Sequence, residues 1–188
     1  MARLDGNAAR ESARSILARA GAACCAAGVV FCTSPAGAQD VRIAVFPFEL
    51  MDTSVEGSLG GERADQSKRL ELISAQLERM LKEGGLVPVD LAPVRDRFAK
   101  LSPMRNCNGC ETDLGRDLGA QLVVTGLVQK FSNLILNIRI IVRDVQSGEF
   151  VRIGIADIRS DTDETWTRGV SYLVRNRLLD PPLVKAPP

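Results

Sequence analysis

The sequence contains no histidine, and this absence excludes several classes of active site. Imidazole is the base in Ser-His-Asp and Cys-His catalysis, a ligand in H-E-x-x-H zinc sites, and the side chain that most readily exchanges protons near neutral pH. An excess of charge of one sign is also lacking, since 24 Lys and Arg stand against 23 Asp and Glu. The composition therefore gives no signature of a nucleic-acid or anionic-lipid binder. We predict no catalytic residue, no metal ion and no cofactor.

Three of the five cysteines lie in the first part of the chain. In this part basic, apolar and small residues follow one another as in a secretory signal peptide. Four arginines precede an apolar run at 20–32, and the residues at 35–38, Pro-Ala-Gly-Ala, supply the small side chains of a cleavage site. The run is shorter than the roughly 20 residues that span a bilayer. We expect cleavage after Ala38, a periplasmic product without a transmembrane segment, and a single α/β domain at 39–188. A buried amino-terminal helix is the alternative.

Only Cys107 and Cys110 remain after such a cleavage, and the net charge becomes −1. In an oxidising compartment an even pair favours a disulfide. A C-x-x-C at a helix start can also be a redox pair, because the helix dipole stabilises the thiolate. No thioredoxin-like strand precedes this motif, so a structural disulfide is the favoured interpretation. A lone pair without histidine is a weak zinc signal.

Alternating blocks of strand-like and helix-like residues predict one α/β domain. Residues 42–48 and 122–128 are apolar and typical of buried strands, whereas 62–83 carry apolar side chains at helical spacings of three and four. The other predicted elements are a short edge strand at 86–89, helices at 91–101, 111–118 and 162–179, and alternating strands at 134–144 and 150–158. Helical connections favour parallel pairing and turns favour antiparallel pairing. We therefore predict a mixed five-stranded sheet with helices packed on it.

The predicted topology brings several loops to one edge of the sheet. If the strands at 42–48, 122–128 and 150–158 are parallel, their carboxyl ends share this edge, where open α/β sheets bind ligands. The loops expected to meet there are 49–61, 129–133, 159–163 and the cysteine loop 107–110. The predicted binding edge consists of Asp52, Thr53, Ser54, Lys130, Asn133, Arg159, Asp161, Asp163, Glu164 and Trp166.

The acidic string at 161–164 has two interpretations. It could bind calcium or magnesium, or Asp161 could cap the following helix with Glu164 three residues on. The spacing fits a capping box and Trp166 occupies the position of the EF-hand glycine, so the cap is favoured. Trp166 also lies on the apolar stripe of its helix and is predicted to pack in the core. The string Asp52-Thr53-Ser54 fits ordinary turn chemistry.

Several strings resemble the TolB amino-terminal and CsgG-like periplasmic α/β domains. They are Ile-Ala-Val-Phe-Pro-Phe at 43–48, Gly-Ala-Gln-Leu-Val-Val-Thr-Gly at 119–126, and Asp-Val-Gln-Ser-Gly-Glu at 144–149. The resemblance covers most of 41–179. It implies a TolB amino-terminal-like fold and a role in envelope assemblies through protein contacts, without enzymatic activity.

Four other strings are similar to a proteobacterial family of predicted secreted proteins of unknown function. They lie at 48–54, 107–111, 130–136 and 161–166. Ser160 stands where that family pattern has glycine. The resemblance implies a neighbourhood of periplasmic quinoprotein alcohol-oxidation systems and offers no active-site residue.

We therefore predict a non-enzymatic periplasmic accessory or adaptor protein whose partner is another periplasmic or envelope protein, bound at the edge or on the polar face of the sheet. A thiol-disulfide redox protein using Cys107 and Cys110 is one alternative. A small-ligand or metal-binding module using Asp52, Asp161 and Asp163 is the other.

Overall fold

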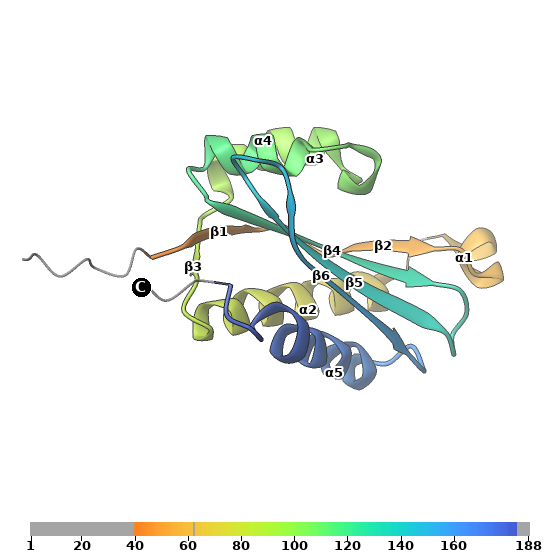
Figure 1. The fold of residues 1–188 in the computed structure, drawn as a ribbon. Helices are drawn as coiled ribbons and strands as arrows, with labels where there is room; N and C mark the ends of the chain where they lie inside the picture. Colours follow the sequence, from red (N-terminus) through yellow and green to blue (C-terminus); the bar gives the residue numbers. More distant parts are fainter. Residues whose placement is uncertain (1–39, 62, 184–188) are drawn as a thin grey trace, which may run out of the picture. The chain divides into compact units, whose positions relative to one another are not determined.

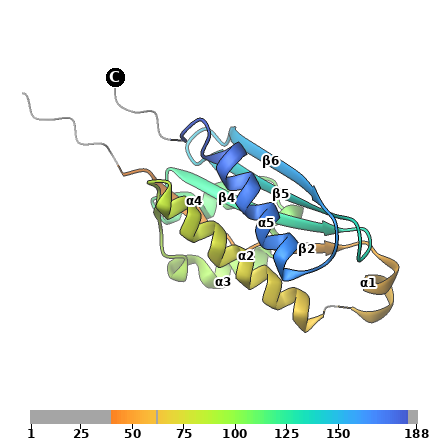
Figure 2. The ribbon, with the colours of Figure 1, turned by 90° about the horizontal axis from the view of Figure 1, so that it is seen from below.

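The computed structural model describes residues 40–61 and 63–183. The predicted signal peptide at 1–38 lies outside these residues. In the described part, a sheet is covered by α2 (Ala64–Glu83) and α5 (Asp163–Leu173) on one face and by α3 (Arg95–Leu101) and α4 (Cys110–Asp117) on the other (Figure 1). Figure 2 shows α2 and α5 side by side over their face. A π-helical turn, Val174–Leu178, extends α5. No helix of the described residues is long and apolar enough to cross a membrane.

The sheet is mixed, as predicted, and has six strands. Its order is β3 (Val87–Pro88), β1 (Arg42–Val45), β4 (Leu122–Lys130), β5 (Leu136–Asp144) and β6 (Phe150–Ile158). β1 runs parallel to both β3 and β4, whereas β5 is antiparallel to β4 and β6. The short strand β3 lies at the edge, as its proline indicates. The predicted α/β class and the mixed pairing are both confirmed.

The sixth strand, β2 (Glu49–Asp52), corrects the expectation that a loop follows Phe48. Ile43 of β1 pairs with Leu122, and Glu49 of β2 pairs with Leu127, so the first strand has one extra residue between the two pairs. This is the geometry of a bulge, and it falls around Pro47, which has no N–H to donate. The proline interrupts the strand, which then resumes pairing with β4.

Two apolar clusters hold the layers together. The larger one joins the sheet to α2 and α5 and contains the fully buried Trp166, Leu77 and Ile138. The smaller one lies beneath α3 and α4, where Phe98 stacks on Phe46 with ring centroids 5.5 Å apart. Gly126 of β4 is required on the side of the larger cluster, since a Cβ there would come within 2.3 Å of the Phe48 ring.

One half of a sheet face has no helix over it. α3 and α4 cover β1 and the beginning of β4, while Ile153 and Ile155 of the edge strand β6 are about half exposed on the same face. The predicted alternation in β5 is confirmed, because Leu136, Ile138, Ile140 and Val142 are buried toward α2 and α5. The polar residues of β5 therefore face outward, on what we call the open face.

Candidate functional site

The predicted edge is built around a buried lysine. Lys130, the last residue of β4, is fully buried, and its Nζ lies 3.2 Å from Asp161 Oδ2 and 3.5 Å from Asp52 Oδ2. Asp52 ends β2, and Asp161 lies in the loop between β6 and α5. A buried ammonium requires opposite charge close by, so this residue holds two strand ends and a loop together.

Two residues of α2 complete this cluster. The Gln66 amide donates to Asp52 Oδ2 at 3.4 Å and to Asp161 Oδ2 at 3.5 Å. Arg69 donates to Asp161 at 3.1 Å and to Asp163 at 2.7 Å. Neither was predicted from the sequence, although Gln66 lies four residues before Leu70 on the apolar stripe, and a polar residue there is a signal of buried pairing. We call Asp52, Gln66, Arg69, Lys130 and Asp161 the ionic cluster.

The surroundings shift the pKa values of two members of the ionic cluster, Asp52 and Arg69. Burial raises the pKa of Asp52, but hydrogen bonds from Ser54 and the charge of Lys130 outweigh it, so the pKa lies below its usual value. Burial lowers the pKa of Arg69, but its carboxylate partners, Asp163 first, raise it overall. Each carboxylate that could bind a cation is thus already paired with a basic side chain. No group of three acidic or cysteine side chains in 40–61 and 63–183 could hold a metal ion.

The cap of α5 differs from the predicted one. Thr162, not Asp161, is the N-cap, accepting a hydrogen bond from the Thr165 backbone, and the Thr165 hydroxyl accepts one from the Thr162 backbone. Asp161 is bound instead to Lys130 and Arg69. Glu164 is exposed and pairs with Arg168 at 3.2 Å. Ser160, just before this turn, is the one non-glycine residue with positive φ among those described, at 78°.

The other residues of the predicted edge, except Arg159, have structural roles. Thr53 donates from its backbone and its hydroxyl to the Lys130 carbonyl, and the Ser54 hydroxyl caps α1 (Val55–Gly60). The Asn133 carbonyl accepts from the Asp161 backbone at 3.0 Å. Three of the four predicted loops, 49–61, 129–133 and 159–163, therefore meet at this end. Trp166 is fully buried in the core, and Arg159 is exposed.

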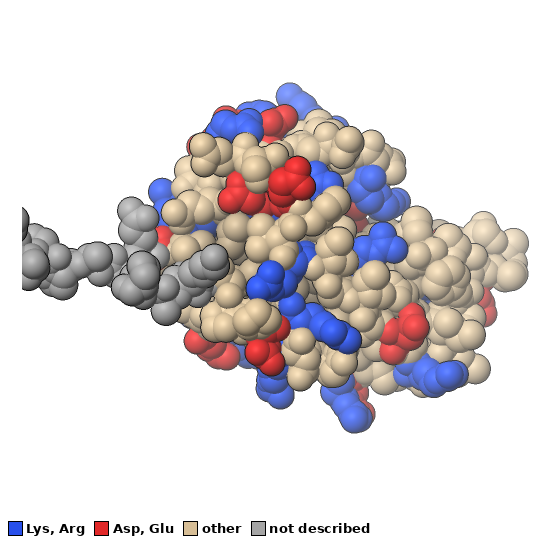
Figure 3. Space-filling model, viewed as in Figure 1, with Lys and Arg blue, Asp and Glu red and all other residues tan. Residues whose placement is uncertain are grey.

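Exposed apolar side chains border the ionic cluster. They lie on α1 and on the turn between β4 and β5. The side-chain amide of Asn133 in this turn donates a hydrogen bond to Glu56 of α1 at 3.4 Å, so the two segments adjoin. We call them the apolar rim: Val55, Leu59, Phe131, Leu134 and Ile135. The surface over α1 shows few charged side chains (Figure 3). The sequence interpretation missed this rim, because α1 lies in a predicted loop and 134–135 were assigned to a strand.

The cysteine loop does not join this edge, contrary to expectation. Cys107 and Cys110 are linked as a disulfide with Cα atoms 5.8 Å apart, just before and at the start of α4. The preceding turn is held against the sheet, where the Met104 and Arg105 backbone amides donate to the Glu49 carboxylate. The loop therefore lies over the middle of the sheet, because α4 runs back along this face from a point well before the ends of the strands.

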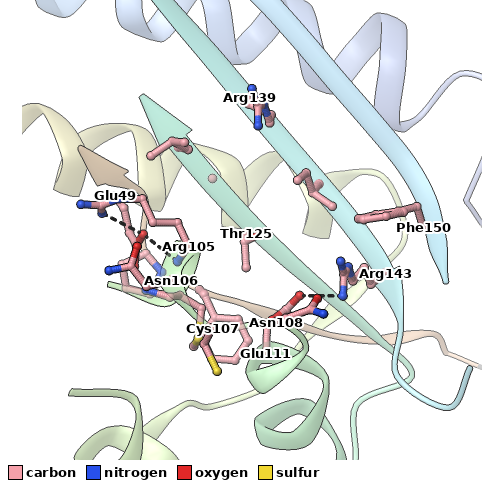
Figure 4. A pocket seen from close by; sticks show the side chains of 16 residues that line it. Glu49, Arg105, Asn106, Cys107, Asn108, Glu111, Thr125, Arg139, Arg143 and Phe150 are labelled. Carbon is pink, nitrogen blue, oxygen red and sulfur yellow. Dashed lines mark hydrogen bonds and ion pairs between the residues drawn. The ribbon is translucent and has the colours of Figure 1, made fainter. Parts of the chain in front are cut away.

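A cavity of about 310 Å³ lies between this loop and the open face. Thr125 of β4 and Arg139 and Arg143 of β5 reach into it, and Phe150 closes one side (Figure 4). Glu111 of α4 pairs with Arg143 at 3.2 Å, and Glu49 of β2 pairs with Arg105 at 3.3 Å. The cavity combines apolar walls with basic side chains.

Comparison with known proteins gives structural likenesses at low identity. No curated protein matches this sequence. The LpoB C-terminal domain from Salmonella enterica is 17% identical with a TM-score of 0.46, covering 65% of this chain and 84% of that one. Lipoprotein GNA1162 from Neisseria meningitidis is 18% identical with a TM-score of 0.46, covering 72% and 96%. TolB from Acinetobacter baumannii is 13% identical with a TM-score of 0.39, covering 73% and 29%.

Scores of this size describe a general likeness and carry no functional information. A family assignment comes from the sequence instead, and it covers β1 through the turn that follows α5. Residues 41–178 match the family DUF3280, described as "Protein of unknown function (DUF2380)", and the chain belongs to this family.

Proposed function

We propose that this protein is a non-enzymatic accessory or adaptor domain that binds another envelope protein through the apolar rim. The observation that carries the proposal is the exposure of large apolar side chains on two adjoining segments. Leu59 is 84% exposed, Val55 72% and Leu134 68%. Contiguous exposed apolar groups on a soluble domain mark interaction surfaces, because their hydration is unfavourable until a partner covers them.

The ionic cluster holds in place the residues that directly precede the two segments of the rim. Lys130 directly precedes Phe131, and Thr53 and Ser54 directly precede Val55, so the ionic cluster and its hydrogen bonds set where both rim segments begin. A surface that is already ordered loses little conformational entropy when it binds. This arrangement favours a specific protein contact.

The charge around the rim favours a protein over a lipid surface. Segments that insert into anionic membranes carry Lys or Arg beside their apolar residues. Neither 53–61 nor 131–135 contains a basic residue, and Glu56 lies within the first of them. A protein partner with an apolar centre therefore fits the rim best.

The sequence resemblance adds a compartment and a first system to search. The predicted signal peptide supports a periplasmic location, and the resemblance to proteins encoded near quinoprotein alcohol-oxidation systems makes their periplasmic subunits the first partners to assay. Both belong to the proposal.

The experiment is an affinity purification from the cells that produce this protein, with bound proteins quantified by mass spectrometry. Leu59→Asp and Leu134→Asp should each reduce recovery of the bound partner at least tenfold. Leu72→Asp is the matched control, because Leu72 is an exposed leucine on α2, outside the rim. Equal recovery with all three variants would overturn the proposal, as would a rim occupied only by a second copy of this chain.

A further inference from the structure

The cavity beside the cysteine loop is independent of the apolar rim and has the features of a ligand site. Its floor is formed by β4 and β5, and its walls by the 104–108 turn, α4 and Phe150 (Figure 4). Its volume of about 310 Å³ is at the small end of the range for sites that bury an organic ligand. Leu127, Ile141 and Met104 supply apolar contacts.

The charges lining this cavity do not cancel. Arg105 is paired with Glu49, and Arg143 is paired with Glu111 and lies over the Phe150 ring, with its guanidinium carbon 4.2 Å from the ring centroid. Arg139 is different, because its side chain has no hydrogen bond or ion pair within residues 40–61 and 63–183. No dashed line reaches it in Figure 4. One positive charge is therefore left over.

The surroundings of Arg139 make that charge unusual. Its cross-strand neighbours are Leu127 on β4 and Ile155 on β6, both apolar. Its Nε is buried without an acceptor, as is that of Arg143, but Arg143 has the Glu111 carboxylate as a partner and Arg139 has none. A buried donor without a partner is unfavourable, so a ligand that supplies an acceptor to this guanidinium is stabilised on binding.

The chemistry of the site selects one class of ligand. A guanidinium presents parallel N–H donors that match the two oxygens of a carboxylate. The single unbalanced charge suits a monoanion, and the carboxylates of Glu49 and Glu111 repel a dianion such as phosphate. We propose that this cavity binds a carboxylate attached to an apolar group, with Arg139 pairing the carboxylate and the wall around Ile141 and Phe150 contacting the apolar part. The source is either a small organic acid or the carboxyl-terminal residue of a protein.

The test is calorimetric titration of the purified protein with 4-phenylbutyrate and with its neutral analogue 4-phenylbutyramide. The acid should bind at least tenfold more tightly than the amide. Arg139→Gln should remove this preference. Arg139→Lys keeps the charge but loses the parallel N–H donors of the guanidinium, so it should retain only part of the preference. Arg79→Gln is the matched control, an exposed arginine on α2 at the opposite face, and should leave the preference unchanged.

A second arm distinguishes the two sources. A hexapeptide ending in phenylalanine is titrated with a free carboxyl end and with an amidated end. Tighter binding of the free-ended peptide than of phenylbutyrate supports a protein chain end, and the reverse order supports a small acid. Equal binding of acid and amide by the wild-type protein overturns the proposal even if Arg139→Gln fails to fold, and so does binding that Arg139→Gln leaves unchanged in a folded protein.

Discussion

Replacing Lys130 by methionine should destabilise the domain by about 3 kcal/mol. Removing one partner of a buried ion pair costs about 3–5 kcal/mol, because the other charge stays buried without compensation. Asp52 and Asp161 side chains are 13% and 10% exposed, so both keep little contact with water. Because Arg69 still compensates the charge of Asp161, we expect a loss of stability at the lower end of this range.

The assay is urea unfolding followed by the fluorescence of Trp166, which is the sole tryptophan and is fully buried. Lys68→Met, at an exposed lysine of α2, is the control and should change the free energy of unfolding by less than about 0.5 kcal/mol. Adding Asp52→Asn and Asp161→Asn to Lys130→Met should restore at least half of the loss, because no uncompensated charge then remains. A loss below about 1 kcal/mol for Lys130→Met alone would show that Lys130 is not needed to compensate Asp52 and Asp161.

Three further predictions concern single features of the fold. Ser160→Gly should raise the free energy of unfolding by up to about 1 kcal/mol, since a φ of 78° is strained for serine but not for glycine; an unchanged or lower stability would contradict this. Because the pKa of Asp52 is lowered in the folded state, its contribution is present above about pH 4 and is lost as the pH falls through the folded value. Acid unfolding should therefore show a step below pH 4 that Asp52→Asn reduces. Reducing the Cys107–Cys110 disulfide should cost about 2 kcal/mol by loop entropy, and a thiol-reductase activity in the folded protein would instead favour the redox alternative.

The helices and strands that can be predicted from the sequence are those specified by local patterns of apolar and polar residues. The alternation of Leu136, Ile138 and Ile140 and the nearly continuous apolar run of β4 specify buried strands without reference to the rest of the chain. The strand β2 was missed because its pairing depends on a partner far along the chain, while the nearby Pro47 suggested an end.

Only those parts of the site that follow from the order and direction of the strands could be predicted from the sequence. Asp52, Lys130 and Asp161 were placed together because the ends of neighbouring strands share an edge. The positions of Gln66 and Arg69 depend on how α2 crosses the sheet, and no local residue pattern specifies this crossing. The cysteine loop was misplaced for the same reason, since helix packing rather than strand order sets how far α4 runs back. Arg139 lies on the outward face that the alternation of β5 predicts, but its side chain's lack of a partner is visible only in three dimensions.

Binding of a partner protein at the apolar rim is tested by placing a photocrosslinking amino acid at Leu134 in the rim and, separately, at Leu72 on α2, in the cells that make the protein. We expect a discrete crosslinked protein at Leu134 that disappears when Leu59→Asp is added, and no such product at Leu72. The same products at both positions, or none at Leu134, would contradict it.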